Sequence, residues 1–66
     1  MVMKLKTTIY RRSGEFIQND NLDISTIQDV ADIIVEQNRG DIIIHQTDSI
    51  LIVKQKDTIL KYEKLD

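Results

Sequence analysis

Three groups of polar residues in this 66-residue chain have side chains that could do chemistry. His45 is the single histidine, and the acids Asp29, Asp32 and Glu36 recur at three- and four-residue spacing. A basic segment, KLKTTIYRR over residues 4–12, holds lysines, arginines and a tyrosine but no acid. Catalysis, metal binding, nucleic-acid binding and protein binding each demand a different pattern from such residues.

The histidine and the acids do not form a pattern that is typical of an enzyme. A nucleophile triad brings a base, an orienting acid and a Ser, Thr or Cys together, whereas His45 lies in an apolar run with isoleucines as its expected neighbours. Carboxylates that act in acid–base catalysis need burial to raise the pKa, and these acids share an exposed helix face. No EF-hand loop, cysteine or Gly-rich phosphate loop is present. We therefore expect no enzyme activity, no metal site and no cofactor.

The basic segment is the candidate for nucleic-acid binding. An alternation of period two places Lys4, Lys6 and Tyr10 on one side of an expected strand, so that Tyr10 could stack on a base while the lysines contact phosphates. Arg11 and Arg12 follow at the turn. The chain has a formal charge of −2 and a pI of about 5.2, unlike the basic footprint of most such domains. Lysines also protect an edge strand from pairing, and we favour that role here.

The acidic residues favour a contact with another protein. Asp29, Asp32 and Glu36 fall on one side of an expected helix, and Ile33 lies beside them as an apolar anchor. Charged groups of this kind steer association and set specificity, so this face could dock on a basic groove. The alternative is a solvated helix face with one exposed isoleucine, which is common on protein surfaces.

Residues 24–38 carry the helical repeat that positions these acids. Apolar residues recur three and four positions apart on the opposite face, and they are Ile24, Ile27, Val30, Ala31, Ile34 and Val35. The residues expected to cap the helix are Asp23 or Ser25 at the start, with Gln28 at capping-box spacing from Ser25, and Asn38 and Gly40 at the end.

An N-terminal hairpin is expected before this helix. Residues 3–11 alternate apolar and polar side chains, which is typical of a strand with one buried face. A tight turn at Ser13-Gly14 would place Arg12 opposite Glu15 and Tyr10 opposite Ile17. The return strand is predicted to be short, around Phe16 and Ile17, because the polar run QNDN follows it.

Three strands are expected after the helix, at about 41–46, 49–55 and 58–64. Two-residue loops at Thr47-Asp48 and Lys56-Asp57 would join them as antiparallel hairpins. The sequence therefore predicts one α+β domain over residues 1–66, in the order β-β-α-β-β-β, with one helix packed on an antiparallel sheet.

The second face of this sheet raises the main question about the chain. Two-residue loops would set Ile44 opposite Leu51 and Ile42 opposite Val53, on the face that the helix covers. The other face would then hold Ile43, His45, Ile50, Ile52 and Ile59. Fully burying one such isoleucine is worth about 1.5–3 kcal/mol, so we expect a cover for this face. The N-terminal hairpin could fold over it, or another chain could pack on it, and the sequence leaves both open.

Length and composition narrow the class of protein. A domain of this size buries only about 60% of its unfolded surface, and without cysteine it has no disulfide to compensate. No apolar run approaches the roughly 18–20 residues that span a bilayer, and no signal peptide is recognisable. We expect a cytoplasmic, non-enzymatic regulator, adaptor or inhibitor that acts as a homodimer and binds a larger protein, its identity open. The alternative is a nucleic-acid-binding module that uses residues 4–12.

Overall fold

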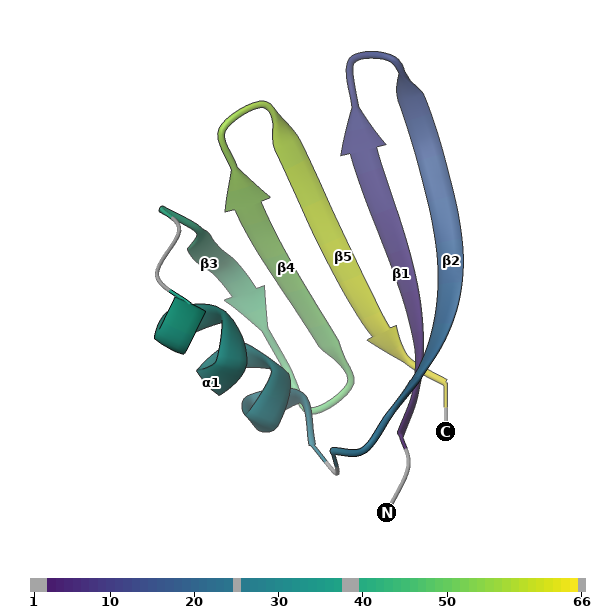
Figure 1. Ribbon diagram of the computed structural model, residues 1–66, viewed down its shortest axis with the longest axis vertical. Helices are drawn as coiled ribbons and strands as arrows, with labels where there is room; N and C mark the ends of the chain where they lie inside the picture. The colour runs from purple at the N-terminus through teal and green to yellow at the C-terminus, as the bar shows by residue number, and fades with distance from the viewer. Residues whose placement is uncertain (1–2, 25, 38–39, 66) are drawn as a thin grey trace.

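The computed structural model describes residues 3–24, 26–37 and 40–65. In this part of the chain the elements are β1 (Met3–Arg11), β2 (Gly14–Leu22), α1 (Ile27–Gln37), β3 (Ile42–Gln46), β4 (Ile50–Gln55) and β5 (Thr58–Lys64). The strands form one antiparallel sheet in the order β2-β1-β5-β4-β3 (Figure 1). The predicted α+β class and the element order are confirmed.

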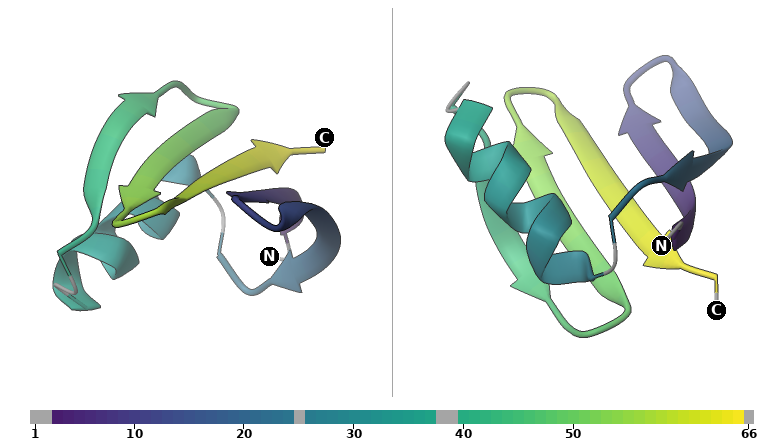
Figure 2. Two further views of the ribbon diagram at one scale, coloured as in Figure 1. Left: turned by 90° about the horizontal axis from the view of Figure 1, so that it is seen from above. Right: turned by 60° about the horizontal axis from the view of Figure 1, so that its bottom comes forward.

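One helical crossover links the two edges of the sheet. β1 pairs with β2 on one side and with β5 on the other, so the first and last strands are neighbours. The chain leaves β2 at one edge, passes through α1 over one face, and enters β3 at the opposite edge (Figure 2). The helix therefore covers one face of the sheet, and its contacts lie towards β4.

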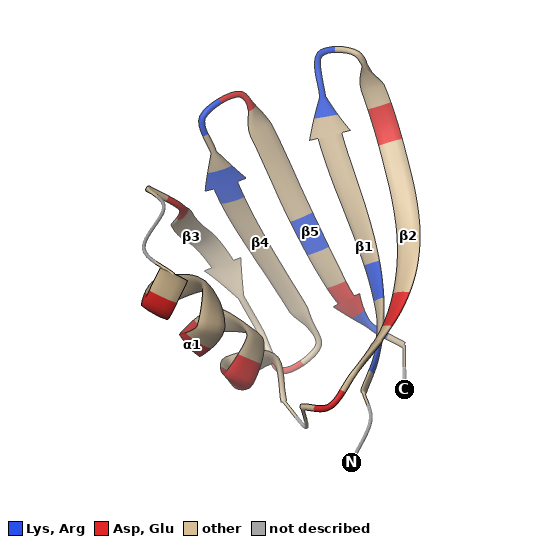
Figure 3. Ribbon diagram, viewed as in Figure 1, with Lys and Arg blue, Asp and Glu red and all other residues tan. Residues whose placement is uncertain are grey.

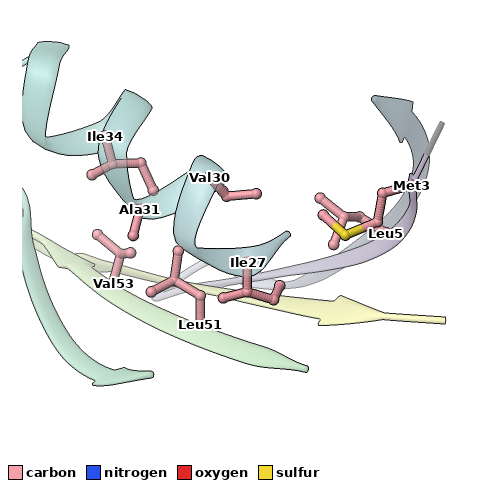
Figure 4. Close-up of a cluster of buried hydrophobic side chains, with 8 residues drawn as sticks. All are labelled: Met3, Leu5, Ile27, Val30, Ala31, Ile34, Leu51 and Val53. Atoms are coloured by element: carbon pink, nitrogen blue, oxygen red, sulfur yellow. The ribbon is translucent and has the colours of Figure 1, made fainter. Parts of the chain in front are cut away.

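The core lies between α1 and the sheet (Figure 4). Its buried hydrophobic residues are Met3, Leu5, Ile27, Val30, Ala31, Ile34, Leu51 and Val53. The partly buried residues that pack against it are Ile24, Ile43, Leu60 and Tyr62. Four of the six residues predicted for the apolar helix face are buried in α1, whereas Ile24 packs against the core before the helix begins and Val35 is exposed.

The helix begins later than the periodicity indicated. α1 starts at Ile27, and Thr26 caps it: Asp29 N donates to Thr26 Oγ1 at 3.1 Å, and Thr26 N donates to Asp29 Oδ2 at 3.2 Å. This reciprocal pair is a capping box, so the predicted box at Ser25 and Gln28 is one residue too early. Ser25 and the predicted C-terminal cap Asn38 lie outside the described residues.

The N-terminal hairpin differs from its prediction in turn and length. Arg11 pairs with Gly14, so Arg12-Ser13 form the turn and Tyr10 lies opposite Glu15 rather than Ile17. Gly14 follows the turn with φ +138°, a conformation that glycine adopts readily. The polar residues after Ile17 continue β2 to Leu22, because backbone pairing with β1 outweighs their weak strand propensity.

The β3–β4 register also differs from its prediction. Thr47 N donates to Ile50 O at 2.8 Å, and Thr47 Oγ1 accepts hydrogen bonds from Ser49 N at 3.2 Å and Ile50 N at 3.0 Å, so the chain reverses at Asp48-Ser49, one residue later than predicted. A register shift lies between Ile43 and His45, so Ile43 pairs with Val53. The predicted pairs Ile44–Leu51 and Ile42–Val53 are therefore wrong.

The β4–β5 hairpin agrees with its prediction. Gln55 pairs with Thr58 around the two-residue turn Lys56-Asp57, and Lys56 takes a positive φ of 35°. Leu51 and Val53 consequently share the helix-facing side with their partners Tyr62 and Leu60.

Candidate functional site

The sheet face turned away from α1, here called the uncovered face, presents isoleucines from three adjacent strands. Ile50 and Ile52 of β4 are half-buried, whereas Ile59 of β5 is 38% exposed and Ile42 of β3 is 59% exposed. Strand alternation and register place these side chains on the face: Lys4, Lys6, Thr8, Tyr10, Glu15, Ile17, Asn19, Asn21, Ile42, His45, Ile50, Ile52, Lys54, Ile59, Lys61 and Glu63.

The N-terminal hairpin extends the sheet and does not cover this face. β1 lies beside β5, with Tyr10 opposite Ile59 and Lys6 opposite Glu63. β2 continues the sheet beyond β1 (Figure 2), and Ile17 of β2 adds another exposed apolar side chain. The alternative in which the hairpin folds over the isoleucines is therefore wrong, and the alternative of another chain remains a prediction.

One predicted member of the interface lies on the other side of the sheet. Ile43 packs against the core under α1, because the register shift in β3 exchanges its place with that of Ile42. His45 pairs with Ile52 and keeps its predicted side of the sheet. The role of His45, Ile50, Ile52 and Ile59 in binding stays a prediction.

The uncovered face carries more positive than negative charge. Its lysines are Lys4, Lys6, Lys54 and Lys61, and its acids are Glu15 and Glu63. Lys61 Nζ lies 3.5 Å from Glu63 Oε1 on the same strand. α1 has three acids and no basic residue (Figure 3), so the two sides of the molecule differ in charge although the whole chain has a formal charge of −2.

The basic segment is divided between the two sides of the sheet. Lys4, Lys6 and Tyr10 share the uncovered face, as the alternation predicted. The Arg11 guanidinium instead lies 5.6 Å from the centroid of the Phe16 ring, on the side of α1, and Arg12 is in the turn. Sequence reasoning missed that Lys54 and Lys61 would join the first group, since this depends on which strands are neighbours.

The acidic residues of α1 have local roles. Asp29 is half-buried and belongs to the capping box, and Asp32 Oδ1 accepts a hydrogen bond from Gln28 Nε2 at 2.8 Å. Glu36 and Ile33 are exposed, and so is Val35. Asp29 thus stabilises the helix itself, and the role of this face in binding a partner stays a prediction.

An open cavity of about 670 Å³ lies at the start of α1. Its lining residues are Thr26, Ile27, Gln28, Gln46, Thr47, Asp48 and Lys64. Across it, Gln46 Nε2 donates to Gln28 Oε1 at 2.8 Å, which ties β3 to the helix. The lining combines two glutamines and two threonines with Asp48, Lys64 and Ile27, and no histidine is among these residues.

The side chains of the described residues that could ligate a metal ion do not gather in one place. No three His, Asp or Glu side chains among them lie close enough together to hold a metal ion. No helix in this part of the chain is long and apolar enough to cross a bilayer. Comparisons with protein-family models, curated proteins and solved structures found no match.

Proposed function

We propose that this protein is a non-enzymatic regulator or inhibitor that acts as a homodimer and binds a larger protein through the uncovered face. The observation that supports the proposal is the exposure of Ile42 and Ile59, at 59% and 38%, on a face that no other described element covers. Each isoleucine that a partner buries contributes up to about 1.5–3 kcal/mol.

The charges around these isoleucines indicate the chemistry of the partner. Lys54 lies between Ile42 and Ile59 across the sheet, and Lys61 lies beside Ile52. Interfaces have an apolar centre and a polar rim, and complementary charge guides their association. The fitting target is therefore a protein surface with an apolar centre and acidic residues around it.

A double variant of the uncovered face tests this proposal. Ile42→Lys with Ile59→Lys places charges where both side chains are already exposed, so circular dichroism should show an intact fold. The matched control is Ile33→Lys with Val35→Lys, which changes two exposed apolar residues of α1. The target is isolated from the native host with the wild-type protein, and its affinity for each variant is measured by calorimetry.

We expect the variant of the uncovered face to lose binding at least about tenfold while the helix variant keeps wild-type affinity. The reverse result would support the acidic helix face, with Asp29, Asp32, Ile33 and Glu36, as the contact. Wild-type affinity in both variants would contradict both assignments.

Nucleic-acid binding is the second candidate, and one observation favours it: Lys4, Lys6 and Tyr10 lie on the same face as Lys54 and Lys61. A single-stranded oligonucleotide could stack on Tyr10 while the lysines contact its phosphates. Fluorescence anisotropy at low salt should then show binding that falls steeply as salt rises.

Lys6→Ala and Lys61→Ala should each weaken this binding, since both lysines lie in the middle of the face. Lys56→Ala, in the β4–β5 turn, is the control with the same loss of charge. Equal effects of all three would indicate a general electrostatic attraction, and an unchanged anisotropy at low salt would remove this candidate.

A further inference from the structure

β2 has nine residues, and no strand in the described part of the chain pairs with its outer edge. β2 ends the strand order of the sheet (Figure 1), and its pairing with β1 runs without a shift from Met3↔Leu22 to Arg11↔Gly14. Its sequence, GEFIQNDNL, contains neither the proline nor the lysine that commonly block an edge. The opposite edge strand, β3, has five residues and a register shift. β2 is therefore the edge that another strand can extend.

A backbone hydrogen bond between Lys4 of β1 and Leu65 shows which residues of β2 face outward. Leu65 N donates to Lys4 O at 3.0 Å, so the backbone of Lys4 is turned towards β5 and away from β2. In an antiparallel pair, hydrogen-bonded and non-hydrogen-bonded positions alternate. Asn21, the partner of Lys4, is therefore in a non-hydrogen-bonded position, and its own N–H and C=O point out of the sheet. The same alternation applies to Glu15, Ile17 and Asn19.

Two adjacent side chains of this edge, Phe16 and Ile17, place one apolar group on each face of the sheet. Ile17 is 57% exposed on the uncovered face, and Phe16 is 51% exposed on the side of α1. Phe16 and Ile17 add no stability from burial while the edge is in water. Pairing with another strand would bury both side chains against that strand. The outward backbone groups and the apolar side chains thus lie in the same stretch of β2.

We propose that two copies of the chain join their β2 strands antiparallel, about a two-fold axis at Ile17. Each Ile17 then pairs with the second copy's Ile17, and Glu15 pairs with the second copy's Asn19. This inference rests on the homodimer of the proposed function, and it identifies the outer edge of β2 as the dimer interface. It leaves the uncovered face free for a target.

The outward backbone groups restrict the register. Only pairings among Glu15, Ile17, Asn19 and Asn21 bring outward N–H and C=O groups together. A two-fold axis at Ile17 satisfies this condition, sets two β-branched side chains opposite each other, and places no like charges in opposite positions. Isologous pairing of this kind closes at a dimer.

This register also brings opposite charges together. Asp20 falls opposite the second copy's Gly14, and the neighbour of that glycine in the next strand is Arg11. A Cβ at Gly14 would meet nothing within 4 Å, so the space between the two side chains is open. Neighbouring strands lie about 4.8 Å apart, which puts the two Cα atoms roughly 10 Å apart, within reach of an arginine and an aspartate. The symmetry makes two such pairs.

The two-fold axis stands perpendicular to the joined sheet, so both uncovered faces lie on the same side. The dimer presents one continuous surface of paired strands, with the two helices on the opposite side. A target bound to this surface contacts both copies, which raises its affinity without any new contact type.

Cysteine cross-linking reads the register directly, because the chain has no cysteine of its own. Opposite residues in a hydrogen-bonded antiparallel pair have Cα atoms about 5.5 Å apart, a distance that a disulfide spans. Ile17→Cys is oxidised with glutathione disulfide beside the control Ile42→Cys, an equally exposed isoleucine on the other edge strand. We expect a disulfide-linked dimer to form at least about tenfold faster for Ile17→Cys.

Equal rates for the two variants would overturn the β2 contact. Faster cross-linking in a mixture of Ile17→Cys and Asn19→Cys than in Ile17→Cys alone would overturn the register, since those residues meet only if the axis lies at Gln18. Wild-type chain that sediments as a monomer at high concentration would reject the dimer.

A charge exchange supplies an independent test of the ion pairs. Arg11→Glu and Asp20→Arg should each raise the dissociation constant of the dimer about threefold to tenfold in sedimentation equilibrium, because each sets like charges side by side. The double variant should return it to within about twofold of wild type. Additive losses would contradict the pairing. If these tests fail but the protein still binds its target, the β2 contact is rejected and target binding through the uncovered face is not.

Discussion

The two faces of β4 carry apolar side chains of nearly equal size that have different environments. Leu51 and Val53 are 0% exposed beneath α1, whereas Ile50 and Ile52, which alternate with them along the strand, are only half-buried on the uncovered face. Side-chain type does not explain the difference, since isoleucine is as apolar as leucine. The cover explains it: α1 packs on one face, and no second helix among the described residues lies on the other. A strand that is apolar on both sides is stabilised by burial of both faces. The topology of the fold decides which of the two faces is buried within one chain.

Alanine substitutions on the two sides of β4 should separate these roles most strongly. Leu51→Ala removes a fully buried side chain and should lower the free energy of unfolding by about 2–5 kcal/mol. Ile52→Ala removes a half-buried side chain and should cost roughly 1 kcal/mol, about half of the value for full burial. Urea denaturation followed by circular dichroism, at a concentration where the chain is monomeric, measures both. Equal losses would mean that another surface covers Ile52 in the monomer.

The covering helix depends on its cap, and weakening the cap should expose the covered face alone. Thr26→Ala removes the hydroxyl that accepts from Asp29 N and should lower the free energy of unfolding by about 1 kcal/mol. Hydrogen exchange should quicken in α1 while the β5 amides keep their protection until global unfolding. Thr26→Ser keeps the hydroxyl and is the control. A serine variant as unstable as the alanine variant would show that the threonine methyl group, and not the cap, stabilises this end.

The helix and the strands were largely predictable because their patterns are local. Period-three and period-four spacing located α1, although the helix begins at Ile27 rather than Ile24, and alternation located β1 at its observed bounds, Met3–Arg11. The β4–β5 register also followed from a two-residue loop. The β3 register did not, because the hydrogen bonds of Thr47 and the shift near Ile43 change the count by one residue, and one residue exchanges the faces of a strand.

The candidate site was only partly predictable because it depends on contacts that are distant in the sequence. The pairing of β1 with β5 decides that the N-terminal hairpin extends the sheet, and no local pattern records this choice. The same pairing brings Lys6 next to the strand of Lys61 and so collects the charges of the uncovered face. The polar run QNDN does not by itself predict a strand. Its residues belong to β2 because their backbone pairs with β1.

The smallest expected difference between the two faces is a pH-dependent contribution of Tyr62, on the covered face, to the free energy of unfolding. Burial on the covered face raises the pKa of its hydroxyl above the ordinary value of 10.0, and the carboxylates of Asp41 and Asp20 raise this pKa further. The folded state thus keeps the phenol proton at a pH where the unfolded chain has begun to lose it. The contribution to stability is complete below the unfolded pKa and is lost as pH rises through the folded pKa.

The free energy of unfolding of the wild type should therefore fall more steeply above about pH 10 than that of Tyr62→Phe, while the two curves run parallel between about pH 7 and pH 9. Tyr10→Phe removes a hydroxyl from the uncovered face and is the control for the loss of any tyrosine. Urea denaturation across this pH range measures the slopes. Equal slopes for wild type and Tyr62→Phe would mean that water reaches the Tyr62 hydroxyl freely, and the covered face would then end at Leu51 rather than continue onto β5.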